Sequence, residues 1–297
     1  MIFLTVILPV LLIFLSGYVL QRSFKLDLKP ISTLAIYVLS PALVFQTFYT
    51  TPLDIRLFYI VAISLLLLIS LIIVTLLTAK LLNYDNKQSS ALLLSTAFMN
   101  SGNYGAPIIL FAYGATGFQY AVSMMVFHSI IMSVFGVYFA SRGQNGAGIA
   151  IKTVFKMPSN YAVVLAVLFQ HFHVQIPDTF NEAIDLVGKA AIPTVMLVLG
   201  MQLANVTSKS LEWPGICLAS IIRLIASPIL AYGICLFFPI DPLLEKVIVI
   251  LAAMPSAATT TMYAIQFNTR PQFVSSNTLV TTVLSFGTLT LLLNIMK

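Results

Sequence analysis

Hydrophobic residues form long, nearly continuous runs along this chain, separated by short polar loops. A helix needs about 20 apolar residues to cross a hydrocarbon core about 30 Å thick, and runs of that size recur along the whole sequence. The runs do not alternate with polar positions, which favours helices over barrel strands. The pattern predicts ten transmembrane helices, at residues 1–21, 30–49, 57–79, 90–113, 118–140, 159–176, 180–204, 213–238, 243–267 and 272–296.

Composition and charge agree with an integral membrane protein. The chain is 59% hydrophobic and only 8% charged, whereas soluble domains carry about 25% charged residues. Lys and Arg concentrate in one set of alternate loops, which predicts that this set is cytoplasmic and that both termini lie outside. The net charge of +6 reflects this asymmetry and suits contact with anionic lipid headgroups. Nothing in the sequence supports nucleic-acid binding.

Four pairs of short segments recur at nearly constant spacing. Residues 39–48 resemble 191–200, 97–105 align with 252–260, 118–123 with 271–276, and Phe-Gly recurs at 135 and 286; the offsets are 152, 155, 153 and 151 residues. Five helices per unit would place the second copy in the opposite orientation. We therefore expect two inverted five-helix repeats, 1–141 and 159–297, joined by a cytoplasmic linker at 142–158. Inverted repeats are typical of transporters; the alternative is a duplication that only builds a larger bundle.

Two of the predicted helices carry helix breakers near mid-span. The fourth run contains Gly102, Gly105 and Pro107, and the ninth contains Pro255 followed by small and hydroxyl residues. Unsatisfied backbone groups are costly in hydrocarbon, so irregular backbone at membrane depth is tolerated only where it lines a cavity or is buried in protein. The pattern predicts two discontinuous helices that meet at the bilayer centre; the alternative is a simple kink in each.

The predicted breaks offer a site for an anion. A half-helix N-terminus carries about half a positive charge and free N–H groups, which suits a carboxylate. Neutral polar side chains beside the breaks can add hydrogen bonds; the candidates are Asn100, Ser101 and Asn103 in the fourth run, and Ser256, Thr259 and Thr260 in the ninth.

Arg223 lies near the middle of the eighth run, where an ionisable group costs about 2.5–3.5 kcal/mol on insertion scales. No acidic residue lies at a matching depth. Arg223 is therefore a candidate partner for a mobile anion. The alternative is that it bonds the backbone carbonyls that the breaks expose.

Three further residues are candidates for coupling transport to an ion. His128, in the fifth run, has a side chain suited to relaying protons, although a helix-bridging role is the alternative. Asn277 and Thr281, in the tenth run, can line the same cavity or bind a cation through neutral oxygens. No metal site, cofactor or catalytic residue is predicted, because His171 and His173 have no companion ligands, and Ser101 and Ser256 lack a recognisable base.

The segment "MNSGNYGAPI" at 99–108, the duplicated unit and Pro255 together resemble the auxin efflux carrier family, within the bile acid/sodium symporter fold. The resemblance implies a scaffold of helices 1, 2, 6 and 7 and a transport bundle of helices 3–5 and 8–10. It further implies that the broken helices cross at the substrate site and that the bundle moves against the scaffold in an elevator-like way. Positions carried over to the crossing are Asn100, Ser101, Asn103, Tyr104, Pro107, Pro255, Ser256 and Thr259.

The resemblance also bears on substrate and coupling. Characterised relatives carry organic anions such as auxin, malate or malonate, and homodimers through the scaffold are implied. Sodium-coupled relatives tend to use an acidic cation ligand, yet no Asp or Glu lies deep in any run here. Uniport, exchange and proton coupling therefore stay open.

Together these observations predict a secondary transporter of small organic anions, mono- or dicarboxylates, in a bacterial inner membrane. A passive anion channel and a non-transporting membrane sensor are the alternatives. An intramembrane enzyme is the least supported class.

Overall fold

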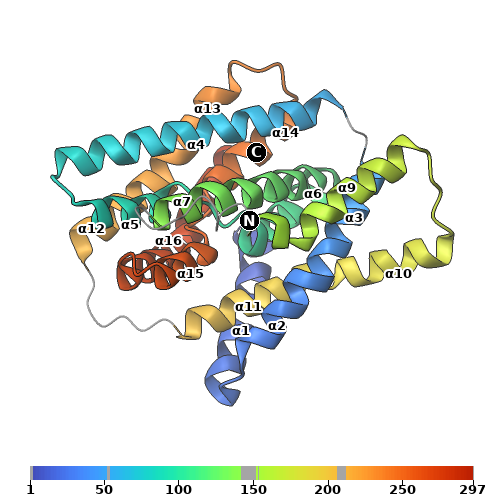
Figure 1. Ribbon diagram of the computed structural model, residues 1–297, viewed down its shortest axis with the longest axis horizontal. Helices are drawn as coiled ribbons and strands as arrows, with labels where there is room; N and C mark the ends of the chain where they lie inside the picture. The colour runs from blue at the N-terminus through green and yellow to red at the C-terminus, as the bar shows by residue number, and fades with distance from the viewer. Residues whose placement is uncertain (1–2, 52–53, 142–151, 153, 206–211, 297) are drawn as a thin grey trace.

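Helices make up nearly all of the described chain. The structure is a computed structural model that describes residues 3–51, 54–141, 152, 154–205 and 212–296 (Figure 1). The elements up to residue 140 are η1 Phe3–Ile7, α1 Leu8–Phe24, α2 Leu28–Leu34, η2 Ala35–Leu39, α3 Ser40–Thr50, α4 Ile55–Leu81, α5 Asn86–Thr96, η3 Ser101–Gly105, α6 Ala106–Ile131, η4 Met132–Gly136 and α7 Val137–Ala140, where η denotes a π-helical turn. Those that follow are α9 Pro158–His171, α10 Asp178–Lys189, α11 Ala191–Asn205, α12 Trp213–Ile221, η5 Ile222–Ala226, α13 Ser227–Cys235, α14 Pro242–Ala252, α15 Ala258–Gln266 and α16 Pro271–Ile295.

Within the described residues, seven helices are long and apolar enough to cross a membrane. They are Phe3–Phe24, Leu28–Thr50, Ile55–Leu81, Ser101–Ala140, Asp178–Asn205, Trp213–Cys235 and Pro271–Ile295. The predicted all-helical membrane fold is thereby confirmed, while the ten-helix inverted repeat stays a prediction. The predicted linker at 142–158 lies outside the described residues except for 152 and 154–158.

The predicted runs that do not appear among these seven are interrupted or short in the structure. The fourth is split between α5 and the start of Ser101–Ala140, and that long helix bends at Gly114, where φ is +67°. The sixth is α9, with 14 residues, and the ninth is split into α14 and α15, with 11 and 9 residues. The halves of a broken helix are not counted among the seven because each half is too short to cross a membrane by itself.

Prolines explain most of the π-helical turns. Four of the five described turns are each followed two residues later by a proline, namely Pro9, Pro41, Pro107 and Pro228. A proline ring clashes with the carbonyl four residues earlier and provides no N–H to it. In each case that carbonyl belongs to the turn, and a wider turn relieves such a clash. The chain therefore continues as a helix through these prolines.

The helices fall into two groups by their closest packing. The first group contains α1, α2, α3, α9, α10 and α11, with α3 against α9 and α10. Helices α1 and α11 cross at glycines: a Cβ on Gly200 would lie 2.0 Å from the Phe14 carbonyl oxygen, and one on Gly17 would lie 2.2 Å from that of Leu197. Only glycine permits backbones to approach this closely.

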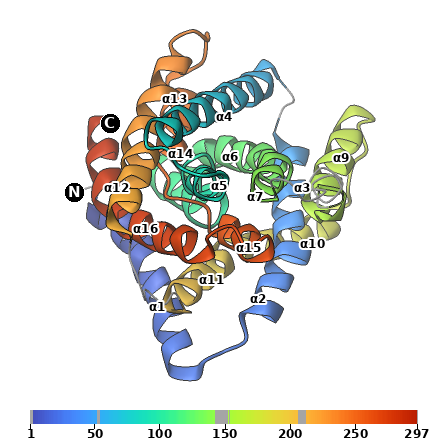
Figure 2. The same cartoon turned by 60° about the vertical axis from the view of Figure 1, so that its left-hand side comes forward.

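The second group contains α4, α5, α6, α7 and α12 to α16. Helix α5 lies at its centre, in contact with α4, α12, α15 and α16 (Figure 2). Residues 89–96 of α5 are all buried, although four of the eight are Ser or Thr. A short polar helix enclosed on all sides is expected where backbone ends must be satisfied inside the protein.

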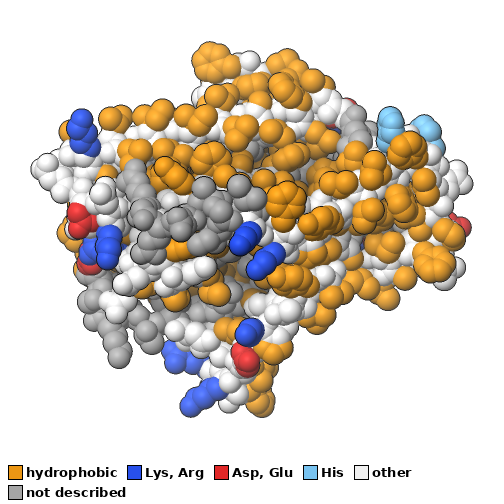
Figure 3. Space-filling view, in the orientation of Figure 1, with side chains coloured by type: hydrophobic (Ala, Val, Ile, Leu, Met, Phe, Trp, Pro, Cys, Tyr) orange, Lys and Arg blue, Asp and Glu red, His pale blue; other side chains and the backbone are white. Residues whose placement is uncertain are grey.

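The outer surface is broadly apolar. Figure 3 shows hydrophobic side chains covering much of one face, with most of the Lys and Arg side chains seen there at its lower and left parts. Large exposed hydrophobic residues include Leu4, Leu77, Leu186, Ile229 and Leu291. An apolar surface of this extent suits a lipid environment.

Candidate functional site

The two helix breaks meet in the structure. Met99 and Ser256 form an isolated antiparallel bridge. The Asn100 amide donates to the Pro255 carbonyl at 2.8 Å, and the Ala257 amide donates to the Phe98 carbonyl at 3.0 Å. The predicted meeting of the two breaks is confirmed by these bonds. They satisfy backbone groups that would otherwise be unpaired in a buried, water-poor region.

The place where the two breaks meet is called the crossing below. Arg223 bonds the ends of the two helices that lead into it, α5 and α14. Its side chain is 0% exposed. It donates to the Thr96 carbonyl, the last of α5, at 2.8 Å, and to the Ala252 carbonyl, the last of α14. Ser227 Oγ lies 2.5 Å from the guanidinium and itself donates to Ala252 at 2.8 Å. One guanidinium therefore caps two helix C-termini, whose dipoles favour a cation.

This arrangement corresponds to the second of the two interpretations of Arg223, in which it bonds carbonyls freed by the breaks. Its described hydrogen bonds go to backbone carbonyls and Ser227 rather than toward an open cavity. Attraction of a mobile anion by direct contact with Arg223 is not provided by this geometry. Its charge acts through the helix ends it neutralises.

A second set of contacts supports the crossing from α16. Asn277 Nδ2 donates to Ser256 Oγ at 2.9 Å and to the Ser95 carbonyl at 3.3 Å. Ser256 Oγ also donates to the Ser95 carbonyl, and the Ser256 amide lies 3.3 Å from Thr281 Oγ1. Asn277, Thr281 and Ser256 are all 0% exposed. Two of the three coupling candidates, Asn277 and Thr281, therefore bond to the crossing from α16.

The second halves of the broken helices begin without side-chain caps. Their N-cap residues, Asn100 and Ala257, make no side-chain capping hydrogen bond. Asn100 is 5% exposed, and its Nδ2 has no partner among the described residues. Its carbonyl accepts from the Gly105 amide at 3.0 Å. Both starts therefore retain free N–H groups and the positive end of the dipole.

The remaining predicted site residues divide between the crossing and its walls. Asn103 and Thr259 are half-buried at the two helix starts, whereas Ser101 and Thr260 are buried. Thr260 Oγ1 bonds the Ala257 carbonyl at 2.7 Å. Tyr104 is buried against Phe14 of α1, with ring centroids 5.2 Å apart, and its hydroxyl lies 3.1 Å from Ser285 Oγ.

His128 bridges two elements of the second group. Its Nε2 accepts the Met99 amide at 3.1 Å, one residue before the break ends. This is the helix-bridging role that the sequence left as an alternative to proton relay. Among the residues that the structure describes, no three His, Cys, Asp or Glu side chains gather closely enough to hold a metal ion.

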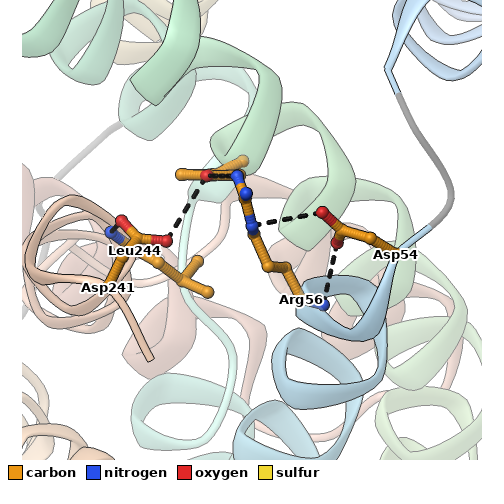
Figure 4. Close-up of polar contacts among 5 residues, drawn as sticks. Asp54, Arg56, Asp241 and Leu244 are labelled. Carbon is orange, nitrogen blue, oxygen red and sulfur yellow. Dashed lines mark hydrogen bonds and ion pairs between the residues drawn. The ribbon is translucent and has the colours of Figure 1, made fainter. Parts of the chain in front are cut away.

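Sequence reasoning missed a series of linked polar side chains at the N-terminal ends of α4 and α14. Arg56 pairs with Asp54 at 3.1 Å and donates to Tyr120 Oη at 2.5 Å, and Tyr120 Oη lies 3.4 Å from Asp241 (Figure 4). Asp54 and Asp241 are the N-caps of α4 and α14. An Asp just before a hydrophobic run was the signal that could have identified the caps. No pattern in the sequence indicates that Tyr120 connects them.

A cavity lies between the two helix groups; it is called the larger cavity below. It has a volume of about 510 Å³ and is bordered by α1, α3, α6, α10 and α11. Its polar side chains include Gln46, Gln119, Asp185 and Lys189, and its apolar ones include Met196. Lys189 pairs with Asp185 at 2.5 Å, as its i,i+4 spacing suggests. The Gln46 side-chain oxygen is buried without a partner in the described residues.

Comparison with known proteins gives the family. A family described as membrane transport protein matches residues 2–293. An uncharacterized transporter of Methanothermobacter thermautotrophicus is 28% identical over 298 residues, covering 96% of this chain and 95% of the relative. An uncharacterized transporter of Methanocaldococcus jannaschii is 25% identical over 292 residues, covering 94% of each. The chain therefore belongs to the membrane transport protein family that includes the auxin efflux carriers.

Proposed function

We propose that this protein is a secondary transporter of small organic anions, and that it binds the substrate carboxylate at the starts of the two second half-helices. Membrane transport follows from the family. A negative substrate charge is favoured because the helix C-termini at the crossing are capped by a cation and the helix N-termini are uncapped. A mono- or dicarboxylate is the substrate class.

The observation that carries the proposal is that both C-terminal ends are neutralised while both N-terminal ends are not. Arg223 bonds the last carbonyls of α5 and α14, whereas Asn100 and Ala257 leave the following helix starts uncapped. The crossing therefore has an excess of positive potential. A carboxylate offers acceptors for the free N–H groups, and Asn100 Nδ2 supplies one further donor.

Alternating access is supported by the contacts of the two helix groups. With Thr5, Phe139 and Lys246 set aside, no described residue makes a side-chain hydrogen bond or ion pair from one group to the other. Each group is tied internally instead, for example Gln21 to Asn205 in the first and Thr269 to Ala140 in the second. We assign the first group as scaffold and the second as the moving bundle, with an elevator-like motion. Each group would contain helices from both inverted repeats.

The 510 Å³ cavity is the proposed outer route to the crossing. It lies between the two groups, and its polar lining consists of the Asp185–Lys189 ion pair and two glutamines. Neutral amides beside a paired lysine hold an anion only weakly, so that it can pass on to the crossing. The chain is proposed to form homodimers through the scaffold, to lie in a bacterial inner membrane with both termini outside, and to use uniport, exchange or proton coupling.

The test is counterflow of radiolabelled malate and indole-acetate in proteoliposomes without an imposed gradient. The intact protein is compared with Asn103→Ala, which removes a half-buried polar side chain at the helix start. Saturable counterflow that is lost in the variant supports a carrier with its site at the break. Conductance under a gradient without counterflow favours an anion channel, and binding without any flux favours a sensor.

A further inference from the structure

A second, much smaller cavity lies next to the crossing, between it and α4. It is enclosed by α4, His128 of α6, Arg223 of η5 and the broken segment after α5, which contributes Met99. Its volume is about 10 Å³, which is close to the minimum that one water molecule requires. The cavity is separate from the larger one between the helix groups.

Two of the residues that line this cavity, Ser64 and Arg223, each have a buried polar atom without a hydrogen-bond partner among the described residues. The Nε of Arg223 is buried and unbonded, although the two terminal nitrogens of the same guanidinium are occupied. Ser64 Oγ, on α4, is also buried without a partner, and Ser64 is 4% exposed. Nearly all buried polar groups in proteins are hydrogen-bonded to protein or water. Two such exceptions beside one cavity therefore indicate a shared ligand.

The third polar side chain of the cavity adds a donor. His128 Nε2 accepts the Met99 amide, so its neutral ring carries its proton on Nδ1. The other lining residues are Leu67, Leu68, Leu71, Ala97 and Met99. Walls of this kind leave space and polar partners for one small molecule that can both donate and accept.

We infer that this cavity holds a single ordered water molecule, which accepts a hydrogen bond from Arg223 Nε and exchanges one with Ser64 Oγ. The water completes the hydrogen bonding of the guanidinium that caps α5 and α14. It also makes Ser64 of α4 a positioning residue for the crossing, although Ser64 touches neither broken helix through a hydrogen bond. This inference does not depend on the nature of the transported substrate.

X-ray hydroxyl-radical footprinting of the whole protein tests the inference, because radiolysis of a bound water oxidises the side chains beside it. Met99 lines the cavity and is only 3% exposed. Met254 is equally buried, at 0% exposure, but is not part of the cavity wall. Met196 is 1% exposed but borders the larger cavity, so it reports water inside that cavity. We expect rapid oxidation of Met99 and Met196 and slow oxidation of Met254.

Ser64→Val fills the cavity and removes a water partner, so Met99 oxidation should fall by about fivefold or more while Met196 and Met254 are unchanged. Ser70→Val, on the same helix and away from the cavity, is the matched control and should leave Met99 oxidation at the wild-type rate. If Ser64→Val does not fold, Ser64→Thr replaces it in the test. Its added methyl group fills the cavity although the hydroxyl is kept, so Met99 oxidation should fall in this variant too. Slow oxidation of Met99 in the wild type, or an unchanged rate in both Ser64 variants, would overturn the inference.

Discussion

Met99 and Ser256 pair as an antiparallel bridge, although they lie 157 positions apart in the sequence. Each belongs to the irregular segment of a broken helix. The bridge joins the two segments through their backbones and leaves their side chains free to face different surroundings. Substrate binding at this point would contact both halves of the chain at once.

Removal of the Arg223 guanidinium is expected to destabilise the protein. In Arg223→Met, the carbonyls of Thr96 and Ala252 lose a buried donor, at a cost of about 1–3 kcal/mol each. The temperature at which the monodisperse fraction falls by half, measured by size exclusion after heating, should drop markedly. Arg270→Met is the control, because Arg270 pairs with the half-exposed Glu212 and exposed pairs contribute about 0–1 kcal/mol. Equal losses in both variants would contradict the capping role.

Asn100→Asp should strongly reduce transport without loss of stability. A carboxylate at an N-cap position is favourable to the helix, and here it would occupy the positive helix ends that we assign to the substrate. We expect a decrease in counterflow of about tenfold or more, corresponding to about 1.4 kcal/mol or more, with unfolding temperature maintained. Asn83→Asp, at an exposed loop position, should transport normally. Normal counterflow in Asn100→Asp would place the anion elsewhere.

Gly200→Ala should disrupt the contact of α1 with α11. The added Cβ would lie 2.0 Å from the Phe14 carbonyl oxygen, so the helices must separate. In Gly287→Ala the added Cβ would meet no heavy atom within 4 Å apart from its chain neighbours and the backbone of its own helix, so this variant should be neutral or gain up to about 1 kcal/mol from helix propensity. Thermal unfolding of both variants measures the difference. Equal stability of the two variants would show that α1 and α11 do not pack this closely at Gly200.

Lys189→Gln should weaken anion capture and leave the transport step intact. Lys189 is paired with Asp185 at the larger cavity, so Lys189→Gln leaves the Asp185 carboxylate unpaired there, and its repulsion of an anion is long-range and screened by salt. We expect KM to rise about two- to threefold at low ionic strength, with less effect at high salt and an unchanged maximal rate. Lys80→Gln, at the far end of α4, is the control. An effect that does not depend on salt would argue against electrostatic capture.

Tyr120→Phe should uncouple Arg56 from Asp241 while the ring packing is kept. Loss of one partly buried hydrogen-bonding group costs about 0.5–1.5 kcal/mol, so a modest decrease in unfolding temperature is expected. Tyr138→Phe, an exposed residue on α7, is the control and should be unchanged. If Arg56→Met lowers stability further in the Tyr120→Phe background by its full single-variant amount, the two residues do not act together.

The sequence alone determined the environment of the protein and the position of its breaks. Continuous apolar runs require a membrane because of their length, and glycine and proline interrupt helices through local sterics that need no tertiary context. The family also followed from local residues around 99–108, and the match over residues 2–293 confirms it. These properties depend on neighbours in the chain, which is why they could be predicted.

Only the tertiary structure decided what the buried polar groups bind. Arg223 had two open interpretations because its carbonyl partners, Thr96 and Ala252, lie 127 and 29 residues away. The same holds for the bond of His128 to the Met99 amide and for the link between Arg56 and Asp241 through Tyr120. A hydrogen bond is directional and acts over about 3 Å. Its partner is therefore set by how distant helices pack, which hydrophobic periodicity does not encode.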